Sequence, residues 1–221
     1  MGMRESVGAF PTTRIEGMLW SAGAVRVAGV DEAGRGAWAG PVVAAAVVLD
    51  PHALEELLPC VRDSKQLSAN QRTAAARVIR ARAMAVGVGT VASRVIDEAG
   101  LAFAGQLAFW RALRSLRGTP DYVLVDGFPL WSDEYRQAAV LQGDQHCLSI
   151  AAASIIAKVT RDDLMRSLDR LVPGYGFAAH KGYGSVGHRE ALLWRGPSTH
   201  HRRSFRPVAA LDGEGALGPP A

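Results

Sequence analysis

A Val-rich segment, residues 25–30, ends in two adjacent carboxylates, Asp31 and Glu32, and the turn 33–40 that follows contains three glycines and Arg35. Glycine N–H groups can approach a phosphate closely because no side chain intervenes, and Arg35 adds positive charge. Two carboxylates would repel that phosphate unless a divalent cation lay between them. The stretch therefore predicts metal-dependent chemistry on a phosphate ester. A solvated turn is the alternative that an isolated Asp-Glu pair would favour.

A third carboxylate, Asp126, directly follows another apolar segment, residues 122–125, and precedes Gly127. This pattern predicts that Asp126 lies at the end of a buried strand, with an N-cap or a turn as its alternative role. Hydrolysis of a phosphodiester by two metal ions needs carboxylates from different elements that hold the ions about 3.5–4 Å apart. Asp126 and the acids at 31–32 are candidates for such a site.

A fourth carboxylate, Asp162, lies in the segment 150–171, which has helical periodicity. Ser154, Lys158 and Asp162 follow one another at intervals of four residues, so we expect them to share one side of the helix. Asp163 is turned about 100° from Asp162 and should face elsewhere. Asp162 is therefore predicted to complete the carboxylate set, with a solvated helix surface as the alternative.

Positive charge gathers near the C-terminus, although the net charge of the chain is only +4. Residues 181–206 contain one acid, Glu190, and six lysine or arginine residues. We expect this stretch, and Arg202 and Arg203 in particular, to contact a phosphate backbone. A solvated surface turn is the alternative.

Lysine is rare in this chain, because only three of its 25 lysine and arginine residues are lysines. Where arginine is the usual cation, a retained lysine indicates a position that needs a compact ammonium group. Ser64 and Lys65 are predicted to bind phosphate, with an exposed turn as the alternative. The other two lysines, Lys158 and Lys181, are predicted substrate contacts as well.

The order of apolar segments predicts a mixed α/β sheet of five strands flanked by helices. A turn of roughly ten residues between the first two strands favours antiparallel pairing, and later strands alternate with helices, as parallel strands do. The expected strands are 25–30, 42–49, 84–92, 122–125 and 138–141. The expected helices are 15–20, a short one after Pro51, 69–82, 101–116, 150–171 and 186–194.

The chain is expected to form one catalytic core, residues 25–172, with attached segments. Residues 1–24 are a lead-in, and residues 173–207 are a helical and loop appendage that binds substrate. Residues 208–221 are rich in Ala, Gly and Pro and are predicted to be a disordered tail.

Composition indicates a cytoplasmic protein. No apolar run is long enough to span a bilayer, and the first twenty residues lack the basic start and apolar centre of a signal peptide. Cys60 and Cys147 have no cysteine or histidine at metal-binding spacing, so they are predicted to be reduced thiols.

Six segments resemble, in the same order, the motifs of bacterial ribonuclease HII, the type 2 ribonuclease H family. They are GVDEAGRG, DSKQLS, VLVDGFP, SIIAKVTRD, YGFAAHKGYG and HHRRSF, and they cover nearly everything between residues 25 and 207. An ordered set of this kind is far more specific than any single motif. The resemblance implies the ribonuclease H-like fold, which agrees with the mixed sheet expected from the strand pattern.

The resemblance also implies an activity. The chain would cut the RNA strand of an RNA–DNA hybrid and nick duplex DNA on the 5′ side of an embedded ribonucleotide, leaving 3′-hydroxyl and 5′-phosphate ends. The implied cofactors are two Mg²⁺ or Mn²⁺ ions, and the chain would act as a monomer without a membrane partner. The implied metal-binding catalytic carboxylates are Asp31, Glu32, Asp126 and Asp162, and the residues implied to read the ribonucleotide are Gly34, Arg35, Gly36 and Tyr183.

Physical chemistry supports a separate set of residues for ribonucleotide recognition, because only a 2′-OH distinguishes RNA from DNA at one nucleotide. Backbone groups of a glycine turn can pair with that hydroxyl, and Tyr183 can stack on the sugar or donate a hydrogen bond. Two other functions stay open, a DNA nuclease or junction resolvase with the same core, and a nucleic-acid-binding module without activity. The glycine turn and Tyr183 argue against the DNA nuclease.

Overall fold

The computed structural model describes residues 10–212, which contain one mixed sheet in the order β3-β2-β1-β4-β5. β1 and β2 pair antiparallel, as do β2 and β3, whereas β4 and β5 run parallel to β1. The strands are β1 (Val27–Ala33), β2 (Val42–Val48), β3 (Ala85–Val91), β4 (Tyr122–Asp126) and β5 (Gln137–Val140). The predicted mixed sheet with an antiparallel start is confirmed.

The helices include the predicted ones and several short additions. The described helices are α1 (Arg14–Ser21), η1 (Pro51–Ala53), α2 (Leu54–Leu57), α3 (Ala69–Arg82), α4 (Ser93–Ala99), α5 (Leu101–Arg114), α6 (Gly143–His146), α7 (Leu148–Leu171), α8 (Phe177–His180), α9 (Val186–Arg195) and α10 (Arg206–Asp212). Four of them, α4, α6, α8 and α10, were not predicted. None of the helices within residues 10–212 is long and apolar enough to cross a membrane.

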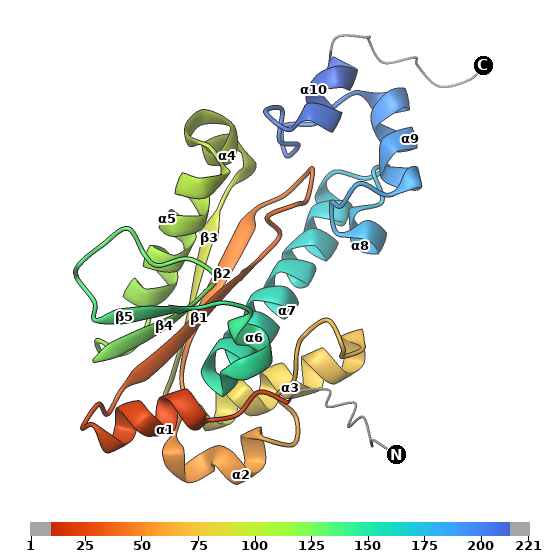
Figure 1. Cartoon of the computed structure of the whole chain (residues 1–221). Helices are drawn as coiled ribbons and strands as arrows, with labels where there is room; N and C mark the ends of the chain where they lie inside the picture. Colours follow the sequence, from red (N-terminus) through yellow and green to blue (C-terminus); the bar gives the residue numbers. More distant parts are fainter. Residues whose placement is uncertain (1–9, 213–221) are drawn as a thin grey trace, which may run out of the picture.

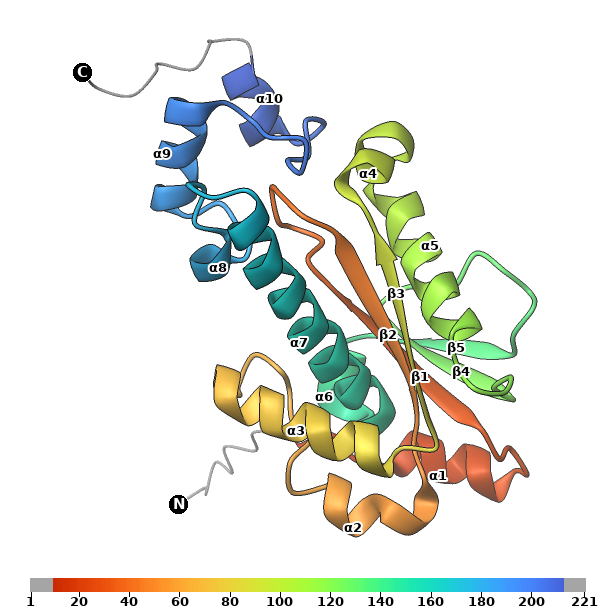
Figure 2. The ribbon, with the colours of Figure 1, turned by 180° about the vertical axis from the view of Figure 1, so that it is seen from behind.

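The sheet lies between α5 on one face and α7 with α3 on the other (Figures 1 and 2). All seven residues of β2 are buried, because this central strand is covered on both faces. Side chains alternate along a strand, so Ala44 and Ala46 pack towards α5 while Ala45 and Val47 pack towards α7. Small residues in β2 let both helices approach closely.

The approach of α7 to β1 requires a glycine. A Cβ atom at Gly29 would lie 2.3 Å from the carbonyl carbon of Ser149, which no side chain could tolerate. The buried residues 151–153 are all alanine and belong to the core on the α7 face of the sheet. The N-terminal half of α7 therefore runs directly beside the strand that ends in Asp31 and Glu32.

Helices α8, α9 and α10 gather at the far end of α7 (Figure 1). Phe177 and Leu192 are buried there against Met165 of α7. Val208 is buried as well, so the expectation that residues 208–221 lack structure is wrong for 208–212, which continue α10. Residues 213–221 lie outside the described part of the chain.

Candidate active site

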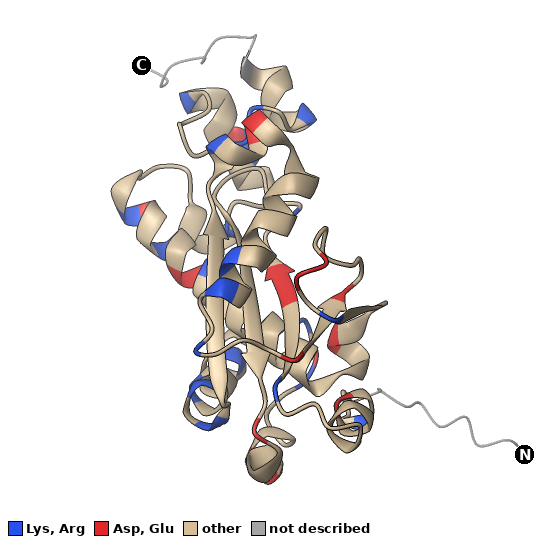
Figure 3. Ribbon diagram, turned by 90° about the vertical axis from the view of Figure 1, so that its left-hand side faces the viewer, with Lys and Arg blue, Asp and Glu red and all other residues tan. Residues whose placement is uncertain are grey.

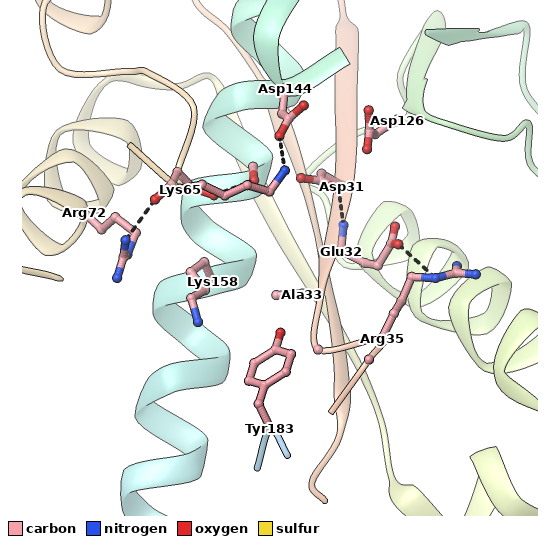
Figure 4. Close-up of a pocket in the computed structure, with 14 residues that line it drawn as sticks. Asp31, Glu32, Ala33, Arg35, Lys65, Arg72, Asp126, Asp144, Lys158 and Tyr183 are labelled. Carbon is pink, nitrogen blue, oxygen red and sulfur yellow. Dashed lines mark hydrogen bonds and ion pairs between the residues drawn. The ribbon is translucent and has the colours of Figure 1, made fainter. Parts of the chain in front are cut away.

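A cleft of about 360 Å³ lies beside the carboxyl ends of β1 and β4 (Figure 4). In Figure 3 the end of β1 is acidic, and β1, β2 and β3 contain no charged residue besides the two there. Four carboxylates from three elements line the cleft. They are Asp31 and Glu32 of β1, Asp126 of β4 and Asp144 of α6.

The register of the parallel strands brings Asp31 and Asp126 together. Val30 lies opposite Val125, so the residue that follows each of them reaches the same edge of the sheet. Asp31 is only 6% exposed, and burial, together with the charges of Glu32 and Asp126, raises its pKa well above the usual range. Burial also raises the pKa values of Glu32 and Asp126. Clustered carboxylates with raised pKa values are typical of functional sites.

Asp144 reaches the cleft from the short helix α6 and was missed in the sequence. The N–H of Gly143 donates a hydrogen bond of 2.6 Å to Asp126 Oδ1, which ties α6 to the end of β4. Asp144 is 4% exposed, and its charge adds to burial in raising the pKa of Asp126. The sequence does contain a feature that indicates Asp144: Gly143 and Asp144 closely follow the strand 137–140, much as Asp126 ends its own strand beside a glycine.

Asp162 does not line this cleft. Eight residues of helix rise about 12 Å and rotate about 80°, so the helical repeat that brings Ser154 to the cleft carries Asp162 away from it. The carboxylate of Asp162 pairs instead with Lys158 Nζ at 2.8 Å. Asp163 faces elsewhere, as predicted, and pairs with Arg166.

Two of the four clustered carboxylates are held by cations. Lys65 Nζ lies 2.9 Å from Asp144 Oδ2, and this hydrogen bond raises the pKa of Lys65 (Figure 4). Arg35 Nε lies 3.5 Å from Glu32 Oε1, and its positive charge opposes the effect of burial on the Glu32 pKa. Both predicted substrate contacts thus stand among the acids.

The donor chemistry of the cleft fits divalent cations. Carboxylate oxygens are the ligands that Mg²⁺ and Mn²⁺ prefer, and a cation would offset the burial and the mutual repulsion that raise these pKa values. As the side chains are oriented, no three His, Cys, Asp or Glu residues within 10–212 are grouped to hold an ion. In this arrangement the carboxylates of Asp144 and Glu32 face Lys65 and Arg35.

The remaining predicted contacts reach the cleft with one exception. Those that line it are Gly34, Gly36, Ser64, Lys158 and Tyr183. The Ser64 hydroxyl lies 3.0 Å from the Ser154 hydroxyl, which joins the loop before α3 to α7. The exception is Lys181, whose ammonium donates to the carbonyl oxygens of Ala178 and Ala179 in α8.

Arg202 is buried behind the glycine turn, so the expectation that it contacts a phosphate backbone is wrong. It is 0% exposed, and burial lowers its pKa to about 9. Its Nε and Nη2 donate to the Gly40 carbonyl at 3.1 and 2.9 Å, and its Nη1 donates to the Arg35 carbonyl at 2.7 Å. Arg203 is exposed, and its phosphate contact stays a prediction.

Replacement of Arg202 by Ala is expected to destabilise the fold. Hydrogen bonds from a charged donor contribute about 1.5–3 kcal/mol each, and Gly40 and Arg35 would be left with unpaired carbonyls. A thermal melt should show a midpoint lowered by several degrees, whereas Arg189→Ala, at an exposed position, should leave it nearly unchanged. A melting temperature equal to that of the parent would show that Arg202 does not hold the turn.

Comparison with known proteins agrees with this architecture. The family profile described as Ribonuclease HII matches residues 28–208. The ribonuclease HII of Synechococcus sp. (strain JA-3-3Ab) is 51% identical over 201 residues, covering 91% of this chain and 90% of the relative. That of Chloroflexus aggregans is 51% identical over 203 residues, covering 91% and 96%.

A solved structure gives the same result for the fold. The ribonuclease H2 of Pyrococcus horikoshii OT3 matches with a TM-score of 0.69 at 29% identity, covering 85% of this chain and 97% of the other. The five-stranded sheet and its flanking helices thus have the ribonuclease H-like arrangement that the motifs implied. The chain belongs to the ribonuclease HII family and is a ribonuclease H, a metal-dependent endonuclease.

Proposed function

We propose that the chain cuts the RNA strand of RNA–DNA hybrids and nicks duplex DNA on the 5′ side of an embedded ribonucleotide, leaving 3′-hydroxyl and 5′-phosphate ends. The observation that supports this most directly is the meeting of carboxylates and the glycine turn in one cleft. All of these groups come from one chain, so we propose that the monomer is active.

The proposed metal ligands are Asp31, Glu32, Asp126 and Asp144, with Asp144 in place of Asp162. Two Mg²⁺ or Mn²⁺ ions bound there would supply a hydroxide nucleophile and stabilise the leaving 3′-oxygen. The ammonium of Lys65 and the guanidinium of Arg35 would leave the carboxylates for the phosphates on either side of the cut. Before the substrate arrives, the two ion pairs partly neutralise Asp144 and Glu32.

We assign recognition of the ribose to the turn and to Tyr183. Glycines 34 and 36 expose peptide groups that can pair with a 2′-OH as donor or acceptor. The Tyr183 hydroxyl points into the same cleft (Figure 4). Ser64 and Lys158 line the cleft and are assigned to the phosphate backbone.

The test is cleavage of a labelled DNA duplex that carries one ribonucleotide. We expect a nick on its 5′ side with Mg²⁺ or Mn²⁺, little product with Ca²⁺, which prefers longer and more flexible coordination, and none in EDTA. An all-DNA duplex of the same sequence is the control and should stay intact. Cleavage that survives EDTA would refute the metal mechanism, and cleavage of the control would favour a DNA nuclease.

A further inference from the structure

Histidines hold the loop that carries Tyr183, residues 181–184. His180 Nδ1 lies 3.1 Å from the N–H of Gly182, from which it accepts a hydrogen bond. His180 Nε2 lies 2.7 Å from the carbonyl oxygen of Tyr175. A carbonyl oxygen only accepts, so the proton of the His180 ring lies on Nε2.

Two further imidazoles, those of His201 and His188, form a hydrogen-bonded chain that ends on the carbonyl oxygen of Tyr183. This oxygen lies 2.9 Å from His188 Nδ1 and also accepts from the N–H of Ser185 at 2.8 Å. His188 Nε2 lies 3.0 Å from His201 Nε2, and His201 Nδ1 accepts from the N–H of Ser198 at 3.0 Å. The two ends fix the order, because an amide can only donate and a carbonyl can only accept. His201 Nε2–H therefore donates to His188, and His188 Nδ1–H donates to Tyr183.

Both rings of this pair are enclosed. His188 is 0% exposed and His201 is 2% exposed. Burial lowers the pKa of His188 to about 4 and that of His201 to about 3, so both stay neutral at neutral pH. His180 stacks on His188 with 4.3 Å between ring centroids. The hydrogen-bond order is thus a fixed feature of the folded chain.

The same loop is bonded to the glycine turn. The N–H groups of Trp38 and Ala39 donate to the Gly182 carbonyl at 2.8 and 3.3 Å. The ring of Tyr183 has Lys158 Nζ at 5.7 Å from its centroid, at the wall of the cleft. Both proposed ribonucleotide contacts, the turn and Tyr183, are therefore fixed relative to each other.

We propose that His188, supported by His201, is a positioning residue for ribonucleotide selection, because its Nδ1–H fixes the peptide group of Tyr183 and with it the Tyr183 hydroxyl in the cleft. The inference rests on the proposed role of Tyr183. His188 is buried and lines no part of the cleft, so it acts on the substrate through Tyr183.

Two substitutions of His188 form a matched pair. Asn places an amide N–H near the position of Nδ1 and can still donate to Tyr183, whereas Gln reaches the position of Nε2 and loses that bond. Each is made in the parent and in a Tyr183→Ala background. The measurement is single-turnover nicking, at saturating enzyme and Mg²⁺, of a DNA duplex with one ribonucleotide.

In the parent background we expect His188→Gln to slow nicking about tenfold and His188→Asn to stay within about threefold. In the Tyr183→Ala background the loss caused by His188→Gln should vanish, because the group that His188 positions is gone. A merely structural role would give the same loss in both backgrounds and would overturn the inference.

The Tyr183→Ala variant distinguishes a failure of the proposed role of Tyr183 from a failure of the inference about His188. Should Tyr183→Ala nick as fast as the parent, the role of Tyr183 is refuted, and the positioning role falls with it. Should Tyr183→Ala be slow while the two losses multiply, the role of Tyr183 stands and the inference about His188 alone fails.

Two further measurements cover a His188→Gln protein that does not fold. His201→Phe keeps a ring against Tyr175 and Phe177 but removes the hydrogen bonds of His201. The loss of nicking rate that it causes should also vanish in the Tyr183→Ala background. Nitrogen NMR of the full chain, labelled at histidine, should place the proton of His188 on Nδ1 and that of His201 on Nε2. A proton on Nε2 of His188 would overturn the proposed order.

Discussion

The Asp144→Asn variant is expected to fold and to bind duplex substrate, and to lose cleavage by orders of magnitude. Asn has the size of Asp and keeps an oxygen that can accept from Lys65, but it removes a charge from a site proposed to hold two dications. Single-turnover cleavage at saturating Mg²⁺ measures the effect. A thermal melt in EDTA serves as the folding control.

Two other aspartates provide matched controls for Asp144. Asp163→Asn should stay within a few-fold of the parent, because Asp163 is exposed and pairs only with Arg166. Asp162→Asn should cause a modest loss, since it frees Lys158, which lines the cleft, from its ion pair. If Asp162→Asn is inactive and Asp144→Asn is active, the fourth ligand is Asp162 and the assignment made from the cleft is wrong.

The strand-end acids could be predicted because their neighbours are regular. Asp31 and Asp126 follow apolar segments whose length and β-branched content define strands, so each acid is placed by the strand before it. Asp144 also comes after a strand, residues 137–140, but it does not end that strand directly: it lies in α6, which has only four residues and shows no periodicity. The sequence favours Asp162 instead, because residues at intervals of four start on one side of a helix. Over eight residues, however, the side chain turns by about 80° and no longer faces the cleft.

The buried polar residues that hold the glycine turn and the Tyr183 loop could not be predicted from local sequence. Arg202 resembles any surface arginine in a basic stretch, yet its partner Gly40 lies 162 positions away. Likewise His188 and His201 are buried where α9 and the loop before α10 meet the glycine turn, at Trp38 and Ala39. Burial of a polar group depends on partners that tertiary structure supplies, and periodicity carries no information about them.

The Asp31→Asn variant is expected to lose cleavage and to gain stability when metal is absent. Asp31 is buried beside two other acids, and its raised pKa measures the cost of holding that charge in the folded state. Asn keeps the oxygen that accepts from the N–H of Glu32, at 2.7 Å in the parent. Each kcal/mol saved by not burying this charge beside the other acids is worth about 2–4 °C in a protein of this size. A rise of several degrees in a melt in EDTA at pH 7 is therefore expected.

The dependence of this gain on pH and metal separates it from a general effect on packing. A carboxyl with a raised folded-state pKa holds its proton more tightly when folded, so the stability of the parent falls as pH rises through that pKa. The advantage of Asp31→Asn should hence grow from pH 4 towards pH 7, while Asp133→Asn, at an exposed position, should show none. Saturating Mg²⁺ should reverse the order, because bound cations stabilise the parent and not the variant. A gain that is equal at all pH values and unaffected by Mg²⁺ would mean that Asp31 is neither charged nor a metal ligand.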